Sequence, residues 1–161
     1  MINQRGEEIL LTNNAKGNMI YYANDLDVDH ESSTVFFSDS SRIAPIYDTK
    51  TGLWSTMKAA LTDLFTGYPT GRLLTYNLDT KQSDELLNNI SYANGVALSL
   101  DKSFVLVAET GRARILRYWL KGEKSFIFLF CCRDCLLMSI NQRAQEKYFL
   151  KVFQLFLMEY Q

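Results

Sequence analysis

The sequence predicts a mainly β fold built from repeated antiparallel units, and three observations support this prediction. First, residues 22–28 recur as residues 92–98, at an offset of 70. Second, short stretches rich in β-branched and aromatic residues alternate with turn residues. Third, once an insertion is removed, the first repeat holds four such stretches, and four strands in roughly 40–45 residues is the pattern of a β-propeller blade.

The individual strands follow from the same alternation between apolar stretches and turns. We expect strands at residues 25–29, 35–39, 72–77 and 84–88 in the first repeat, and at 96–99, 104–109 and 114–119 in the second. Residues 8–12 fit the outer strand of a preceding blade. A closed propeller needs at least about four blades. The sequence therefore predicts a partial propeller of about two blades.

An insertion at residues 41–70 interrupts the first repeat and predicts a short amphipathic helix lying over one face of the sheets. Ser55 is the expected N-cap and Gly67 the expected stop of this helix. Its apolar residues fall at helical spacing: Met57, Leu61, Leu64 and Phe65.

The composition changes after Gly122. Residues 123–161 contain no glycine or proline and hold all three cysteines. We therefore divide the chain into a partial propeller domain, residues 7–122, and a C-terminal tail, residues 123–161, expected to be helical. Two readings stay open for residues 126–130: the missing outer strand of the second blade, or an apolar segment prone to aggregation.

The bulk properties exclude several classes of partner. A formal net charge of −1 gives no basic footprint for nucleic acid and no general attraction to an anionic membrane. The longest apolar run, residues 126–132, is far shorter than the roughly 20 residues of a spanning helix. The first residues lack the apolar core of a secretory signal. Two alternatives follow: a cytoplasmic protein, or a fragment without its leader.

Several motifs, taken in order, resemble the strictosidine synthase-like family. They lie at residues 23–27, 37–41, 69–74, 94–99, 107–110 and 117–122, the last reading Arg-Tyr-Trp-Leu-Lys-Gly. The resemblance implies a six-bladed β-propeller with its active site at the mouth of the central channel. It also implies a small-molecule substrate and entry into the secretory pathway, in plants often to the vacuole.

The family reaction is the condensation of tryptamine with the aldehyde of secologanin, a Pictet–Spengler step of alkaloid biosynthesis. The family's catalytic glutamate lies in a late blade, and nothing after Gly122 matches that region. No catalytic residue is therefore assigned in this chain. Many relatives in the family instead resemble calcium-dependent lactonases and arylesterases.

Asn24 and Asn94 are the candidate metal-binding residues. They occupy equivalent points before the innermost strand of each blade, where the resemblance to calcium-dependent relatives implies side-chain carbonyl ligands for Ca²⁺. Calcium takes about 6–8 oxygen ligands, so carboxylates from elsewhere in a complete parent protein are needed. The alternative is that both are turn residues that start strands.

The remaining candidates have simpler interpretations. Asp39 and Glu109 recur near the ends of equivalent strands and are expected to bond nearby backbone amides or an arginine, without a catalytic role. His30, the only histidine, is expected to be exposed in a turn, which disfavours His-based catalysis and zinc. Asn89 begins an Asn-Ile-Ser glycosylation sequon.

Cys132 and Cys135 have C-x-x-C spacing next to Cys131. With no second pair and no nearby histidine, we interpret these cysteines as incidental rather than as a metal or redox site.

Three functional hypotheses follow. The first is a strictosidine synthase-like enzyme, here truncated and inactive. The second is a calcium-dependent esterase or lactonase relative, resting on Asn24 and Asn94. The third is a non-catalytic truncated gene product whose tail is read through an intron. No oligomeric state is predicted.

Overall fold

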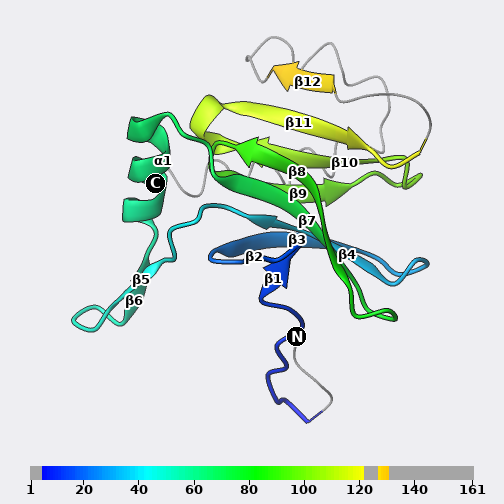
Figure 1. The fold of residues 1–161 in the computed structure, drawn as a ribbon, viewed down its shortest axis with the longest axis horizontal. Coiled ribbons are helices and arrows are strands. Elements are labelled where there is room, and N and C mark those ends of the chain that lie inside the picture. The colour runs from blue at the N-terminus through cyan, green and yellow to red at the C-terminus, as the bar shows by residue number, and fades with distance from the viewer. Residues whose placement is uncertain (1–4, 122–126, 131–161) are drawn as a thin grey trace.

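The structure of the protein, a computed structural model, describes residues 5–121 and the backbone of residues 127–130. Two four-stranded antiparallel sheets lie next to each other (Figure 1). The first has the order β3-β4-β7-β8, with strands at Ala23–Asp29, Thr34–Asp39, Gly71–Asn77 and Ser83–Ile90. The second is β9-β10-β11-β12, at Ala93–Leu98, Phe104–Glu109, Arg114–Trp119 and Ile127–Phe130. This arrangement confirms the predicted fold class of about two propeller blades.

Of the two interpretations of residues 126–130, the structure supports the outer strand of the second blade. Ile127–Phe130 pairs antiparallel with β11 and takes the outer position of the blade. Apart from these four residues, the predicted helical tail lies outside the described residues.

The prediction of an outer strand at residues 8–12 is wrong. Glu8 forms only an isolated bridge, and the first hairpin comes later, with β1 at Asn14–Ala15 and β2 at Asn18–Met19. Lys16 and Gly17 adopt left-handed φ angles of 50° and 79°, and this tight turn reverses the chain. The N-terminal segment therefore covers a sheet face, because Ala15 packs into an apolar cluster of the first sheet.

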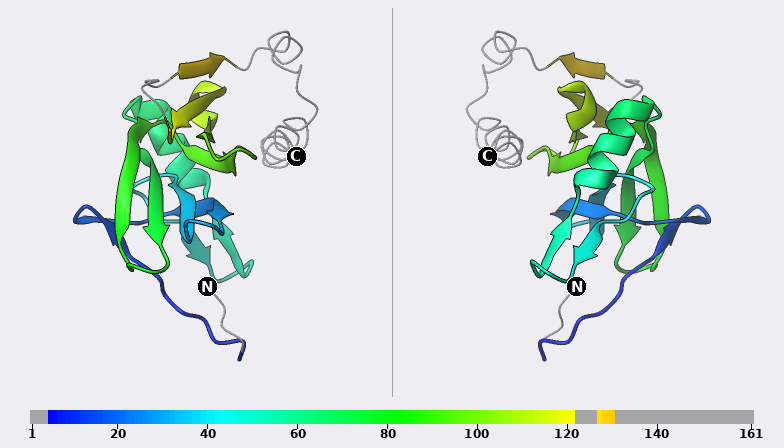
Figure 2. Two further views of the ribbon diagram at one scale, coloured as in Figure 1. Left: turned by 90° about the vertical axis from the view of Figure 1, so that its right-hand side faces the viewer. Right: turned by 90° about the vertical axis from the view of Figure 1, so that its left-hand side faces the viewer.

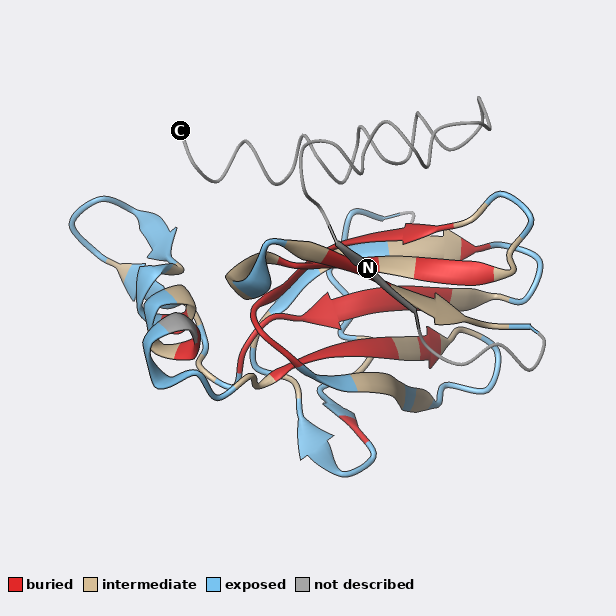
Figure 3. Ribbon diagram, turned by 90° about the horizontal axis from the view of Figure 1, so that it is seen from above, coloured by how far each residue is buried: buried red, intermediate tan, exposed pale blue. Residues whose placement is uncertain are grey.

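The main core lies between the two sheets. Phe36, Leu73 and Ile90 of the first sheet pack with Val96 and Val105 of the second. Because successive strand residues point to opposite faces, the outward face of the first sheet holds a separate cluster. That cluster contains Val35, Phe37, Leu74 and Tyr76 beneath the N-terminal segment. Figure 3 shows the resulting buried centre of the strands.

Carboxylates of the first blade accept hydrogen bonds from backbone N–H groups on the unpaired edge of the second blade. Among the described strands, β9 pairs only with β10, so the N–H groups along its other edge need acceptors. The Asp25 carboxylate accepts a hydrogen bond from Val96 N at 2.9 Å, and the Asp27 carboxylate accepts one from Leu98 N at 3.0 Å. The innermost strands of the two blades are thus joined directly.

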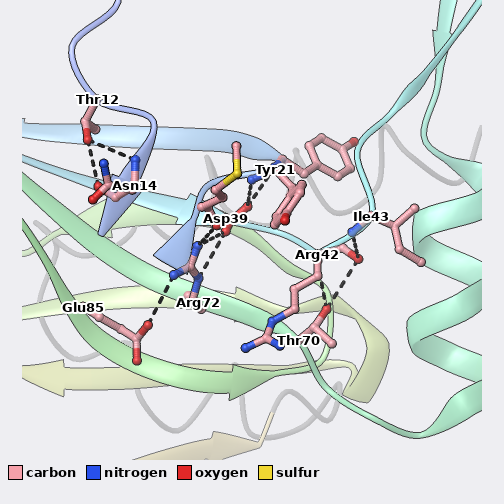
Figure 4. Close-up of polar contacts among 12 residues, drawn as sticks. Thr12, Asn14, Tyr21, Asp39, Arg42, Ile43, Thr70, Arg72 and Glu85 are labelled. Atoms are coloured by element: carbon pink, nitrogen blue, oxygen red, sulfur yellow. Dashed lines mark hydrogen bonds and ion pairs between the residues drawn. The ribbon is translucent and has the colours of Figure 1, made fainter. Parts of the chain in front are cut away.

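A buried ion pair organises the start of the first blade. Asp39 accepts a hydrogen bond from Tyr22 N at 2.8 Å and binds Arg72 Nη2 at 2.5 Å (Figure 4). Arg72 also donates to Met19 O at 2.7 Å and lies 3.4 Å from the Glu85 carboxylate. The third strand, the second strand and the N-terminal segment therefore meet at one guanidinium group.

In the second blade, Glu109 makes contacts equivalent to those of Asp39, with a side chain that is one methylene longer. Glu109 is fully buried and accepts a hydrogen bond from Ser91 N at 2.9 Å. Its two oxygens also bind Arg112 and Arg114. The expectation that Asp39 and Glu109 bond backbone amides or arginines agrees with these contacts.

The insertion between β4 and β7 contains a hairpin as well as the predicted helix. Strands β5, Ile46–Asp48, and β6, Leu53–Ser55, precede α1 at Met57–Thr66. The N-cap is Thr56 rather than Ser55, which belongs to β6. Gly67 ends the helix with a left-handed φ of 63°, as expected for a helix stop.

The predicted orientation of this helix is wrong. Its buried side carries Ala59 and Asp63, whereas Met57, Leu61 and Phe65 are exposed. Figures 1 and 2 show α1 beside the ends of the strands rather than on a sheet face. The apolar stripe therefore points away from the blades.

Replacing Arg72 with methionine tests the buried pair. Arg72→Met leaves the Asp39 carboxylate buried without its cation, so we expect a loss of about 3–5 kcal/mol in the free energy of unfolding. Urea denaturation followed by circular dichroism measures this loss. Lys16→Met, which breaks the exposed Lys16–Asp84 pair, is the control and should change little. Equal stability of the two variants would contradict the assignment.

Candidate functional site

The two candidate metal residues lie at the start of neighbouring innermost strands. Asn24 Nδ2 donates to Ser40 Oγ at 3.0 Å, and Ser40 Oγ donates to Ala93 O at 2.5 Å. Ala93 immediately precedes Asn94. The structure thus brings the two strand starts together through a single hydroxyl group.

The two asparagines differ in their surroundings. Asn24 is exposed, whereas Asn94 is only 5% exposed and interacts within the protein. The Asn24 amide nitrogen donates to Ser40, so its carbonyl oxygen is the acceptor atom left to coordinate a cation. Among the described residues, no group of three or more His, Cys, Asp or Glu side chains could hold a metal ion. The calcium role of Asn24 and Asn94 stays a prediction.

A pair of tyrosines flanks the same strand starts. The hydroxyl groups of Tyr22 and Tyr92 lie 3.2 Å apart, and their rings meet edge to face with centroids 6.0 Å apart. Tyr92 has a φ of 53°, which is uncommon for a bulky residue. The repeat offset of 70 therefore brings equivalent residues into contact at this end of the blades.

Asp63 is a buried acid that the sequence patterns did not identify. It is 3% exposed, and Oδ1 accepts hydrogen bonds from Thr70 Oγ1 at 3.2 Å and Ser41 Oγ at 3.3 Å. Burial raises the pKa of the Asp63 carboxyl, although these hydroxyl groups and the Tyr92 backbone N–H oppose the rise. None of the ion pairs found in the described part of the chain includes Asp63.

The helical pattern explains why Asp63 was missed. Periodicity placed the apolar residues of α1 on the inner side and left Asp63 on the outer side. The sequence feature that could have pointed to a buried acid here is the pair of hydroxyl residues, Ser41 and Thr70, at the two ends of the insertion.

The other candidates lie apart from this group or in structural roles. Asp39 and Glu109 are buried and bound to arginines. His30 is exposed in the turn between β3 and β4, as expected. Asn89 is exposed at the end of β8, and its glycosylation stays a prediction. Cys131, Cys132 and Cys135 lie outside the described residues.

Two adjacent four-stranded blades, joined at innermost strands with polar residues at one end, define this chain as part of a β-propeller. The family model for strictosidine synthase matches residues 24–123. The chain belongs to this family.

Curated relatives agree with this assignment. The chain is 37% identical over 114 residues to strictosidine synthase-like protein 13 of Arabidopsis thaliana, covering 71% of this chain and 25% of that protein. It is 33% identical over 121 residues to the adipocyte plasma membrane-associated protein of Rattus norvegicus, covering 74% and 29%. The chain thus spans about a quarter of the length of these relatives.

A solved structure supports the fold. A protein provisionally assigned as a gluconolactonase superposes with a TM-score of 0.52 at 18% identity, covering 80% of this chain and 39% of that one. At this identity the likeness shows the fold alone. No helix in the described part of the chain is long and apolar enough to cross a membrane.

Asp63→Asn tests the buried carboxyl through the pH dependence of stability. A carboxyl whose pKa is raised on folding contributes stability below its unfolded value of 3.8 and loses it as pH rises through the raised pKa. We therefore expect Asp63→Asn to have a higher urea midpoint than the wild type at about pH 7, with the difference vanishing near about pH 4.

Asp48→Asn is the matched control with the opposite sign. The backbone N–H of Lys50 is the main group lowering the pKa of Asp48, so its contribution is present at neutral pH and lost in acid. A wild-type advantage over Asp63→Asn at neutral pH would contradict the assignment for Asp63.

Proposed function

We propose that this chain supplies two adjacent blades and part of the channel mouth of a strictosidine synthase-like protein, and that it does not itself catalyse the family condensation. The main support is the family match, which covers residues 24–123, the stretch that folds into the two blades. The proposed role is to position a small-molecule site rather than to perform the chemistry alone.

The surroundings of two glutamates in the blades support this proposal. A general base needs an accessible carboxylate within hydrogen-bond reach of its substrate. Glu109 is fully buried and bound to Arg112 and Arg114. Glu85 pairs with Arg72. Neither side chain is available to take a proton from a bound amine.

Incubation with tryptamine and secologanin tests the proposal. We expect no strictosidine above the protein-free background by mass spectrometry, while a full-length strictosidine synthase run in parallel forms product. Circular dichroism on the same sample establishes that the chain is folded. Product formed in proportion to this chain would overturn the proposal.

A calcium-dependent hydrolase is the second candidate function. It is favoured by the exposed position of Asn24 and by the hydroxyl link from Asn24 to the residue before Asn94. Neutral oxygens of this kind are calcium ligands when carboxylates complete the shell.

Calcium titration followed by thermal unfolding tests this second candidate. A ligand that binds only the folded chain must raise its melting temperature, by the equivalent of about 1.4 kcal/mol at roughly tenfold over Kd. Asn24→Ala should abolish the rise, and the exposed Asn88→Ala is the control. No calcium-dependent rise up to millimolar concentrations, or one that survives Asn24→Ala, would remove this candidate.

A further inference from the structure

The insertion carries an exposed apolar surface, which we call the apolar tip. It consists of Ile46, Tyr47, Leu53 and Trp54 of the hairpin, with Met57, Leu61, Phe65 and Tyr68 of the helix and the turn after it. Phe65 is 80% exposed and Tyr68 is 75% exposed. Isolated exposed apolar residues are ordinary, but eight of them in the one insertion of residues 41–70 indicate an interaction surface.

The helix of the apolar tip exposes its apolar face and buries an acid, which is the reverse of an ordinary surface helix. Met57, Leu61 and Phe65 are four residues apart, so they share one face of α1. That face is exposed, whereas the opposite side buries the Asp63 carboxyl. A surface helix normally buries its apolar stripe and exposes its charges. The inversion indicates that something apolar covers α1 when the protein functions.

The shape of the insertion restricts what that cover can be. Figures 1 and 3 show the hairpin and α1 projecting beyond the ends of the sheets, away from the cores of the blades. Tyr47 and Trp54 are directly paired across the hairpin, with ring centroids 5.2 Å apart. A projecting tip that bears tyrosine and tryptophan is suited to insertion into a soft planar surface.

The charges of the insertion complement an anionic surface. Arg42, Lys50 and Lys58 are exposed, and none of the ion pairs found in the described residues involves them. The exposed Lys16, by contrast, pairs with Asp84. The insertion also holds two acids, the buried Asp63 and Asp48, which keeps its negative charge while it accepts the backbone N–H of Lys50, so the three cations exceed the acids by one. The net charge of −1 for the whole chain conceals this local excess of cations.

We propose that the apolar tip docks this protein onto an anionic lipid surface, with Trp54 and Phe65 entering the headgroup region and Lys50 and Lys58 contacting the headgroups. The mode is interfacial, because apolar side chains and flanking cations bind a bilayer without spanning it. This inference is independent of the chemistry of the propeller. A failed activity assay therefore leaves it untouched.

Vesicle binding by the full chain tests the proposal. The protein is mixed with vesicles of phosphatidylcholine containing about 30% phosphatidylserine, with phosphatidylcholine alone as comparison. We expect co-sedimentation with the anionic vesicles, weakened by high salt. Trp119→Phe leaves Trp54 as the single tryptophan, and its emission should shift to the blue on binding.

Matched substitutions separate the tip from the rest of the chain. Trp54→Ser combined with Phe65→Ser should lower partitioning roughly tenfold or more, since both side chains lose apolar contact. Lys50→Glu combined with Lys58→Glu should remove the preference for phosphatidylserine. Leu100→Ser is the control, because Leu100 is 59% exposed but lies in the turn after β9, at the other end of the strands.

The outcomes decide between lipid and the other possible covers. Equal vesicle binding by the wild type and the Trp54→Ser, Phe65→Ser variant overturns the proposal. Blue-shifted Trp54 emission without vesicles also overturns it. In that case, light scattering distinguishes a second copy from another segment of the same chain as the cover. All substituted tip residues are exposed, so circular dichroism should show unchanged folding.

Discussion

The structure depends on one acid at the end of the second strand of each blade. Asp39 and Glu109 each bind the backbone at the start of the innermost strand and an arginine of the third strand, Arg72 or Arg114. Three chain segments therefore converge on one buried carboxylate. The acids differ by one methylene: Asp39 bonds the N–H groups of Tyr21 and Tyr22, and the longer Glu109 side chain bonds Ser91, the equivalent of Tyr21. Each carboxylate is matched by a cation and by amides, which offsets the cost of its burial.

The contact between blades is directional, although the blades repeat. Asp25 and Asp27 accept hydrogen bonds from the edge of β9, while the equivalent positions in the second blade hold Gly95 and Ala97. The second blade therefore cannot offer the same side-chain acceptors to a further neighbour. Because edge N–H groups must be satisfied, any next blade needs a different connection. Repetition of backbone pattern does not imply repetition of interface chemistry.

Local patterns predicted the blades well and the insertion poorly, for physical reasons. Alternating residues identify a strand wherever one face is buried, so β4, β7 and β10 were found within a residue of their ends. Helical periodicity identifies which residues share a face, but it does not say which face is buried. It therefore found α1 and gave it the wrong orientation. The β5–β6 hairpin was missed because strands of three residues carry too little alternation to be recognised.

The position of Asp63 explains how the blade tolerates so long an insertion. Its carboxylate binds Ser41 and Thr70, which stand at the two ends of the excursion. These contacts close the base of the loop beside the last β4–β7 pair, Asp39 with Arg72. The entropic cost of closing a loop rises only slowly with loop length, so the main requirement is that the two ends of the loop are held in place. With the base held by one buried acid, the residues beyond it need not pack against the blade. The insertion can then present tryptophan, phenylalanine and lysine outward without disturbing the register that the blade depends on.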